Sequence, residues 1–503
     1  MEELNALFGG FAVVMTPYNI MLMVIGILLG VIIGVLPGLG GANGVAILLP
    51  LTFSMPPTSA IIMLSCLYWG ALFGGAITSI LFNIPGEPWS VATTFDGHPM
   101  AQNGKADEAL TIAFTSSFIG ALFAVIVITF LAPLVAKFAL KFGPAEFFAV
   151  QFLTFASFIG MGTGSPFKTI MAMCLGFALA AVGLDTITGQ LRMTFDFIVL
   201  LKGFGFLVAV IGLFGIGEML ASMEEGLEFK GAQAKLRLDA VLRTWKTLPR
   251  YWATYLRSCL VGVWMGITPG GATPASFMSY GLARRFSKSP ETFGKGNPEG
   301  IVGPETAAHA AGTAALLPML TLGIPGSPTA AVLLGGLLIW GLQPGPLLFV
   351  EKPDFVWGLI ASMYLGNLVG LIVVLTCVPA FAAILRVPFS IVAPVIMVVC
   401  AVGAYTVNNS MFDVWLMIVF GVMGYVFSKL KYPLAPLVLA LVLGDTAESA
   451  FRQAMLSSQG SVSIFWANPL VTSIMGLGLV MLFWPAISWL LARFRRHRTP
   501  VPV

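Results

Sequence analysis

Apolar residues fill long stretches of this chain, and short polar or glycine- and proline-rich segments separate them. A helix needs about 20 apolar residues to cross a hydrocarbon core of ~30 Å. The pattern therefore predicts a bundle of helices, most of them long enough to span a membrane. The apolar runs fall at 11–36, 43–56, 59–83, 110–135, 145–164, 167–184, 197–220, 255–268, 272–283, 305–322, 327–349, 355–385, 390–407, 413–428, 433–446 and 469–492.

Two neighbouring runs, 255–268 and 272–283, are too short to cross. At ~1.5 Å per residue, each reaches only part of the way through the membrane. Pro269, Gly270 and Gly271 separate them, and basic residues lie on both sides of the pair. We expect a re-entrant helical hairpin whose tip is the Pro-Gly turn. Backbone left unpaired at such a tip is tolerated only inside protein or beside a water-filled cavity.

The same pattern occurs earlier in the chain, which indicates an internal repeat. Two glycines four residues apart are followed three residues later by Pro-Gly in both places, as Gly30, Gly34, Pro37 and Gly38 and as Gly262, Gly266, Pro269 and Gly270. The glycines alone are also explained by close helix packing. A first hairpin with its tip at residues 37–41 and a longer leading helix is therefore expected.

Each hairpin is followed by a second shared signal. Ile84-Pro85-Gly86-Glu87-Pro88 in the first half corresponds to Ile324-Pro325-Gly326-Ser327-Pro328 in the second. Proline inside a helix frees a carbonyl and costs ~3 kcal/mol or more, so two breaks in matching places favour a functional reason. Paired breaks of this kind are typical of the binding site of a secondary transporter.

The predicted fold is an all-α polytopic membrane protein with two repeated halves, expected to be inverted, containing re-entrant hairpins and broken helices. We divide the chain into a first membrane repeat (1–221), a cytoplasmic polar linker (222–254), a second membrane repeat (255–431), and C-terminal helices with a basic cytoplasmic tail (432–503). The positive-inside rule places both basic segments in the cytoplasm. Because the N-terminus lacks Lys and Arg, we expect it outside, on a retained helix rather than a signal peptide.

Composition excludes a soluble protein. The 503 residues are 58% hydrophobic and 10% charged, against roughly 25% charged in an ordinary soluble domain. The net charge of +4 arises from local basic segments and gives no sign of nucleic-acid binding. All five cysteines lie in apolar runs without close pairing, so we expect buried, reduced thiols.

The helix breaks supply the candidate binding residues. Unwound backbone offers carbonyls to a cation, and the N-terminus of the next half-helix offers N–H groups to an anion. The hydroxyls of Ser327 and Thr329 reach a bound carboxylate or cap the half-helix. The anion-binding candidates are Pro37, Gly38, Gly40, Asn43, Gly86, Pro269, Gly270, Gly271, Thr273, Pro325, Gly326, Ser327 and Thr329; the cation-binding candidates are Thr78, Ser79, Asn83 and Glu305. Helix–helix hydrogen bonding is the alternative for Thr78, Ser79 and Asn83.

Ionisable groups within apolar segments mark transport pathways by default. Glu305 and His309 share one helix face, and Glu87 lies in the first break. Two alternatives stay open: Glu305 begins a helix at the membrane boundary, as Pro304 suggests, and His309 is structural. Further along, Asp445, Glu448 and Arg452 are expected to form an interfacial ion-pair cluster.

Enzyme chemistry finds no support, because no metalloprotease, nucleophile-elbow or phosphate-loop motif occurs. Without a nucleotide site, a transporter must use an ion gradient. An integral membrane enzyme remains the alternative from another class, and its mark would be catalytic polar residues gathered in one cavity. A non-transporting sensor or scaffold is disfavoured because it has no use for unwound backbone at membrane depth.

Several motifs resemble those of the large membrane subunit of the tripartite tricarboxylate transporters, over essentially the whole chain. They include Gly34-Val35-Leu36-Pro37-Gly38-Leu39-Gly40, Pro50-Leu51-Thr52-Phe53, Tyr68-Trp69-Gly70-Ala71, Asn83-Ile84-Pro85-Gly86-Glu87-Pro88, Leu322-Gly323-Ile324-Pro325-Gly326-Ser327 and Tyr432-Pro433-Leu434-Ala435-Pro436-Leu437. The sequence departs from the family's Pro-Glu-Ala-Ala-Asn-Asn stretch at residues 304–309, where it ends in Ala308 and His309.

This resemblance implies a carboxylate importer of the bacterial inner membrane, with an elevator-type fold. It also implies two partners, a periplasmic substrate-binding protein and a small four-helix membrane subunit, and a coupling cation, usually Na⁺, with no other cofactor. A stand-alone carboxylate carrier that needs no binding protein is the alternative within transport.

Overall fold

The computed structural model describes residues 2–36, 39–161, 165–185, 188–225, 238–268, 271–384 and 389–496. These residues are almost entirely helical, and their only strands are the short antiparallel pair β1 (Gly183–Leu184) and β2 (Leu191–Arg192). Seven helices in this part of the chain are long and apolar enough to cross a membrane: α2 (Pro17–Val35), α4 (Pro57–Phe82), α6 (Ala106–Ala139), α18 (Pro353–Ile384), α20 (Met411–Lys429), α21 (Leu434–Ser457) and α23 (Pro469–Arg496). The predicted all-α polytopic membrane class is confirmed.

The chain forms two compact units. The first comprises Met1–Leu140 and Gly205–Lys429, and the second comprises Lys141–Phe204 and Leu430–Val503. Both predicted hairpins and both predicted helix breaks belong to the first unit, so each unit is described by itself.

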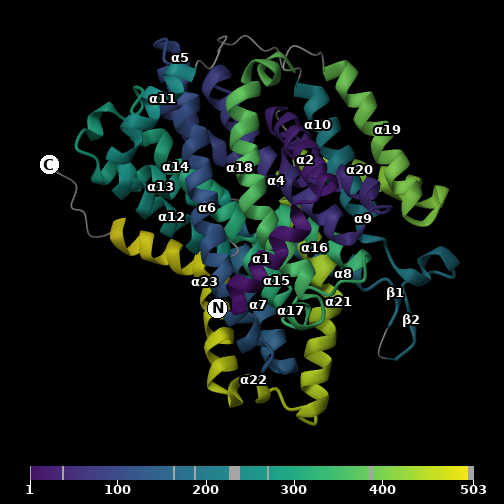
Figure 1. Cartoon of the computed structure of the whole chain (residues 1–503). Coiled ribbons are helices and arrows are strands. Elements are labelled where there is room, and N and C mark those ends of the chain that lie inside the picture. The colour runs from purple at the N-terminus through teal and green to yellow at the C-terminus, as the bar shows by residue number, and fades with distance from the viewer. Residues whose placement is uncertain are drawn as a thin grey trace. The chain divides into compact units, whose positions relative to one another are not determined.

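Helix α4 is the core of the first unit, because every residue from Ser59 to Leu81 is buried. Helix α2 runs alongside it (Figure 1). A Cβ atom on Gly30 would lie 2.1 Å from the carbonyl oxygen of Leu67, and one on Gly34 would lie 2.2 Å from that of Ala71. Glycine therefore allows the two backbones to touch.

A second pair of helices, α12 (Trp252–Ile267) and α14 (Glu299–Ala314), packs in the same way. A Cβ on Gly262 would lie 2.5 Å from the carbonyl oxygen of Ala307, and one on Gly266 would lie 2.4 Å from that of Ala311. In both pairs, moving four residues along the first helix also moves the contact four residues along the second. The paired helices therefore run parallel. The repeated glycine spacing thus corresponds to a repeated packing geometry.

Each leading helix turns back into a short partner, α3 (Gly40–Leu48) after α2 and α13 (Ala272–Phe286) after α12. The hydroxyls of Ser258 and Ser279, 2.6 Å apart, show that α12 and α13 lie antiparallel. Both segments therefore have the predicted hairpin form. The tip residues Pro37, Gly38, Pro269 and Gly270 lie outside the described residues, and re-entry into a membrane stays a prediction.

Both predicted helix breaks are confirmed, and they share one geometry. Helix α4 ends at Asn83 with φ 57°, and α15 (Leu316–Leu322) ends at Gly323 with φ 71°. In each break the next N–H reaches back six residues, from Ile84 to Thr78 at 3.3 Å and from Ile324 to Pro318 at 3.2 Å. This left-handed ending is a common helix C-cap.

Helices resume after both breaks. The first break leads through η2 (Pro88–Ser90) into α5 (Val91–Gln102), and the second leads into α16 (Pro328–Ile339). The other elements of this unit are α1 (Glu2–Val14), η1 (Leu49–Thr52), α9 (Phe206–Val210), the π-helical η4 (Ile211–Ile216), α10 (Gly217–Glu225), α11 (Leu238–Thr247), η5 (Leu248–Tyr251), η6 (Pro290–Thr292), α17 (Leu348–Glu351) and α19 (Phe389–Asn408).

Two sequence predictions need correction. The apolar run 11–36 is not one helix, because the hydroxyl of Thr16 accepts the N–H of Asn19 at 3.3 Å and starts a new helix at Pro17. The cysteines are not all buried, since Cys174 is exposed and Cys377 is half-buried. An apolar run indicates that a residue avoids water, but it does not tell protein from lipid surroundings.

The second unit contains α7 (Pro144–Met161), α8 (Pro166–Ala180), η3 (Ile198–Lys202), α22 (Ile464–Ala467), α21 and α23. Helix α8 packs along α21 at two glycines, because a Cβ on Gly176 would lie 2.3 Å from the carbonyl oxygen of Leu437 and one on Gly444 would meet Ala180 at 2.7 Å. The rings of Phe148, Phe451 and Phe465 join α7, α21 and α22.

Candidate binding site

Glu87 connects the first break to the first hairpin. Its carboxyl oxygen Oε1 accepts the backbone N–H of Gly41, and a Cβ on Gly40 would lie 2.9 Å from the same atom. These two glycines begin α3, which has no side-chain N-cap of its own. The Glu87 carboxyl group, 8% exposed, therefore occupies the N-terminus of this short helix. Acidic groups are favoured at that position by the exposed N–H groups.

At the second break, Ser327 stands where the first has Glu87. Its hydroxyl accepts the N–H of Ala330 at 3.2 Å, so it caps α16, one of the two roles considered from the sequence. Thr329 on the same helix approaches the first hairpin, because a Cβ on Gly41 would lie 3.7 Å from its Oγ1. The start of α16 and the first hairpin tip are therefore neighbours.

Tyr68 on α4 completes this region, although the sequence did not mark it as a site residue. Its hydroxyl interacts with the hydroxyls of Ser327 and Thr329. A Cβ on Gly41 would touch its ring at 3.2 Å, and a Cβ on Gly312 would lie 2.9 Å from its hydroxyl oxygen. The only sign of such a role in the sequence was that the Tyr68 hydroxyl lies within the long apolar run 59–83.

The second hairpin lies beside the first break. The hydroxyl of Ser276 on α13 donates to the carbonyl of Trp89 in η2 at 2.7 Å. The Trp89 side chain also packs against an alanine cluster that includes Ala272, the first residue of α13. Just before it, Gly271 has φ 72° with open space around it, and Thr273 is half-buried. Each hairpin thus contacts the break of the other half as well as that of its own half.

The glycines of the two breaks pack against their own halves. A Cβ on Gly86 would lie 2.3 Å from the carbonyl oxygen of Gly34, and one on Gly326 would lie 2.5 Å from that of Gly266. Real Cβ atoms essentially never approach so closely. Any side chain at either position would therefore push the break away from the leading helix of its hairpin.

The four predicted cation ligands lie on two helices, three of them at the end of α4 and one on α14. The hydroxyls of Thr78 and Ser79 donate to the carbonyl of Gly75 at 3.2 and 2.8 Å, so they bond within α4 rather than between helices. Asn83 is exposed at the end of α4, whereas Asn43 is buried in α3. Glu305 lies on a different helix, α14.

Glu305 is enclosed by hydroxyl groups. It is 2% exposed, and its carboxyl oxygens accept Thr93 at 2.5 Å and Ser117 at 3.0 Å. His309 Nδ1 lies 3.1 Å from the Glu305 carbonyl oxygen and 3.7 Å from its carboxyl group. The prediction that Glu305 and His309 share one helix face is confirmed.

The alternative that Glu305 begins a helix is wrong. Helix α14 begins at Glu299, whose N–H is accepted by the Asn297 side chain at 2.8 Å, and Pro304 lies inside it. Helix α14 therefore begins six residues before the apolar run 305–322, and the run by itself predicted the helix start too late.

Asp96 on α5 makes several buried contacts, although the sequence did not indicate it as an important residue. It is fully buried, and its Oδ1 accepts the N–H groups of Gly294, Gly296 and Asn297 at 2.8, 2.9 and 2.8 Å. Its Oδ2 accepts the Tyr280 hydroxyl at 2.9 Å. Asp96 therefore fastens the helix after the first break to the loop before α14. Little in the sequence indicated this role, because α5 also carries threonine, histidine and glutamine and lies between two apolar runs.

We expect Glu87→Ala to lower the free energy of unfolding by about 1–3 kcal/mol, because the buried N–H of Gly41 loses its acceptor. Glu87→Gln keeps an acceptor oxygen at that place, so its effect should be clearly smaller. Thermal unfolding of both variants in detergent measures the difference. Equal melting temperatures for Glu87→Ala and the wild type would contradict the role given to this carboxyl group.

The chain matches a protein family described as the tripartite tricarboxylate transporter TctA family over residues 20–439, which include both hairpins and both breaks. An uncharacterized 52.8 kDa protein in the TAR-I ttuC' 3'region of Agrobacterium vitis is 37% identical over 483 residues, covering 95% of each chain. An uncharacterized protein in the TAR-II ttuC' 3'region of the same organism is 40% identical over 220 residues, covering 44% of this chain and 91% of the relative. No solved structure matches.

Proposed function

This chain belongs to the tripartite tricarboxylate transporter TctA family, and from this membership we propose that it translocates di- or tricarboxylates as part of a binding-protein-dependent importer driven by Na⁺. The family is a transporter family whose members are the large subunits of tripartite systems. The single observation in favour of a translocation site is that each hairpin lies beside the break of the other half as well as its own, so that both hairpins and both breaks adjoin one another.

We place the carboxylate of the substrate at the start of α16. The helix dipole favours an anion at that end, and three hydroxyls, those of Tyr68, Ser327 and Thr329, gather there. Pro328 has no N–H, and Ser327 already accepts that of Ala330. The hydroxyls and the N–H of Thr329 would therefore bind the anion. At the start of α3 the Glu87 carboxyl group already takes this role. The second break has Ser327 in the corresponding position, so its own residue there brings no carboxyl group to the start of α16.

The cation is proposed to bind near the first break. Hard cations such as Na⁺ prefer oxygen ligands, and the end of α4 offers the side chains of Thr78, Ser79 and Asn83 together with carbonyls freed by the break. Both hydroxyls would have to turn from Gly75, which they contact now. Glu305 is proposed as a further cation ligand because its carboxyl group is buried among hydroxyls.

The remaining parts of the proposal concern the assembly. We propose an elevator-type carrier with inverted repeats in the bacterial inner membrane, with its C-terminus in the cytoplasm. Its partners would be a periplasmic substrate-binding protein and a small four-helix membrane subunit. The matching helix pairs α2–α4 and α12–α14 and the matching left-handed helix ends support the repeat.

Uptake by cells that express this chain tests the proposal. Radiolabelled di- and tricarboxylates are offered with Na⁺ present or replaced by K⁺, to cells with or without the small subunit and the binding protein. We expect uptake only when all components and Na⁺ are present. Uptake without the binding protein would instead identify a stand-alone carrier, and uptake without Na⁺ would remove the proposed coupling ion.

A further inference from the structure

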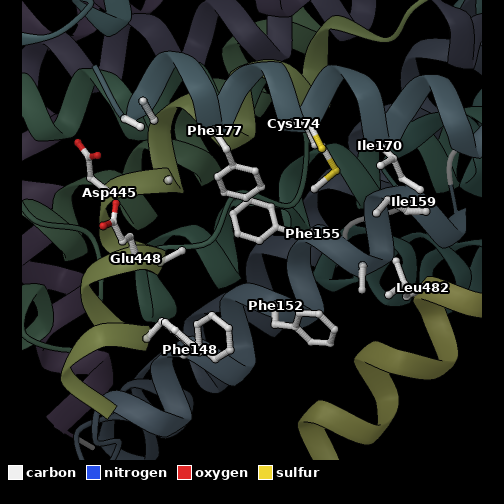
Figure 2. Close-up of a pocket in the computed structure, with 17 residues that line it drawn as sticks. Phe148, Phe152, Phe155, Ile159, Ile170, Cys174, Phe177, Asp445, Glu448 and Leu482 are labelled. Carbon is white, nitrogen blue, oxygen red and sulfur yellow. The ribbon is translucent and has the colours of Figure 1, made fainter. Parts of the chain in front are cut away.

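The second unit contains an apolar cavity of about 630 Å³ among α7, α8, α21 and α23. The rings of Phe152, Phe155 and Phe177 line it, and Asp445 and Glu448 lie at one end (Figure 2). Packed protein interiors leave few voids larger than a water molecule. This cavity falls instead within the range of ~300–1,000 Å³ that is typical of ligand pockets, so it is large enough to hold a ligand.

A second, polar cavity of about 390 Å³ adjoins the first, and Ala180, Ala181, Asp445 and Glu448 line both. Its charged lining residues are balanced, with three acidic and three basic side chains: Asp185, Asp445, Glu448, Arg192, Lys202 and Arg452. The two adjoining cavities thus offer an apolar part and a charged part side by side.

Four of these charged residues form a closed network. Arg452 pairs with Asp185 at 2.9 Å and with Glu448 at 3.1 Å. Arg192 pairs with the same two carboxylates at 3.4 and 3.0 Å. The predicted cluster is thus confirmed for Glu448 and Arg452, and the residues around the β1–β2 turn supply the other two members.

Asp445 and Lys202 are not part of this network. Within the described part of the chain, neither makes an ion pair within 4.0 Å or a hydrogen bond. Both are exposed and line the polar cavity, and Asp445 is attracted at longer range by Arg192. One exposed anion and one exposed cation outside the network therefore line a cavity that adjoins an apolar one.

One end of the charged part lies at the depth of a membrane surface. At the start of α21, Lys168 donates to the carbonyl of Leu430 at 2.6 Å and lies 5.3 Å from the centre of the Tyr432 ring. Lysine and tyrosine are typical of membrane interfaces. Arg452 follows Tyr432 by 20 residues, which at ~1.5 Å per residue corresponds to roughly 30 Å, the thickness of the hydrocarbon core. When the start of α21 lies at one surface, Arg452 therefore lies at the level of the opposite headgroups. Asp445, which follows Tyr432 by 13 residues or roughly 20 Å, lies deeper, so the polar cavity reaches from the headgroups into the hydrocarbon core.

We propose that the two adjoining cavities bind one phospholipid whose headgroup carries a phosphate and a primary ammonium, as in phosphatidylethanolamine. An acyl chain lies among the phenylalanine rings, the phosphate contacts Lys202, and the ammonium contacts Asp445. The equal numbers of acidic and basic side chains suit a headgroup without net charge better than an anionic one. Ile170 and Phe451, 38% and 36% exposed, leave a lateral entrance for the chain. The proposal does not depend on the transported substrate.

The acyl-chain part is tested by photolabelling the assembled complex with phosphatidylethanolamine that carries a photoactivatable acyl chain. We expect labels on α7 and α8, and a loss of about tenfold in Cys174→Trp, because the indole fills space that the chain needs. Phe167→Trp is the matched control, since Phe167 is exposed on the same helix and outside the cavity. Equal labelling of the two variants would overturn the proposal, and so would labels found on the small membrane subunit alone.

The headgroup part is tested by competition with unlabelled lipids. Wild type should prefer phosphatidylethanolamine to phosphatidylglycerol, and Asp445→Lys should reverse that preference because it replaces the partner of the ammonium by a cation. Lys202→Glu should weaken labelling by about tenfold, through repulsion of the phosphate. Lys141→Glu, an exposed charge reversal outside both cavities, should leave labelling unchanged. An unchanged preference in Asp445→Lys would contradict the assigned headgroup contacts.

Discussion

Gly326→Val is expected to abolish carboxylate uptake while the chain still inserts into the membrane. A Cβ at this position would lie 2.5 Å from the carbonyl oxygen of Gly266 and 3.0 Å from the Cα of Ala315. Both contacts are with backbone, so no side-chain rotation can relieve them. Overpacking costs about 1–3 kcal/mol or more, and ~3 kcal/mol corresponds to a factor of about a hundred. The second break would therefore move away from α12, and the start of α16 with it.

The matched control for this variant is Gly281→Val on α13. A Cβ on Gly281 would meet nothing within 4 Å, so the same change of residue type should leave uptake close to that of the wild type. Amounts of both variants in the membrane fraction, measured by immunoblot, separate a transport defect from failed insertion. Normal uptake by Gly326→Val would remove the second break from the proposed site.

Asp96→Ala should cause the largest loss of stability of any change considered for this chain. The substitution removes the acceptor of three backbone N–H groups and of the Tyr280 hydroxyl. Each buried donor left without a partner costs about 1–3 kcal/mol, so the free energy of unfolding should fall by about 3–5 kcal/mol even if water reaches some of the donors. Thermal unfolding of the purified protein, followed by loss of monodisperse material, measures this effect.

Asp96→Asn separates the hydrogen bonds from the charge. The amide oxygen can still accept the three N–H groups, and the amide nitrogen can donate to the Tyr280 hydroxyl. We therefore expect Asp96→Asn to melt well above Asp96→Ala. If both variants melted together with the wild type, the loop before α14 would not depend on this carboxylate.

The elements around the breaks were predictable because their causes are local. Proline lacks an N–H and glycine readily adopts positive φ values, so a Pro-Gly pair disfavours the continuation of a helix. The chain accordingly turns back after Gly34 and after Gly266, and α4 and α15 end at Asn83 and Gly323. Two helix starts were missed. The apolar run 11–36 continues through the cap at Thr16, and the apolar run 305–322 begins after the start of α14, where the Asn297 side chain accepts the N–H of Glu299.

The pairing of distant residues was not predictable from spacing. Glu87 was recognised as a charge within the first break, but its contact with Gly41 joins residues 46 positions apart. The contact between Asp96 and Asn297 spans 201 positions. No periodic pattern relates such residues, because their approach depends on how whole helices pack.

By itself, the sequence determined the membrane class, the two hairpins and the two helix breaks, since hydrophobicity and backbone restrictions act within a few residues. Tertiary structure alone decided that each hairpin meets the break of the other half, that Tyr68 lies beside Ser327, and that Asp185 and Arg192 join the cluster on α21. These arrangements arise from close packing of glycine-bearing helices and from buried polar groups that must find partners.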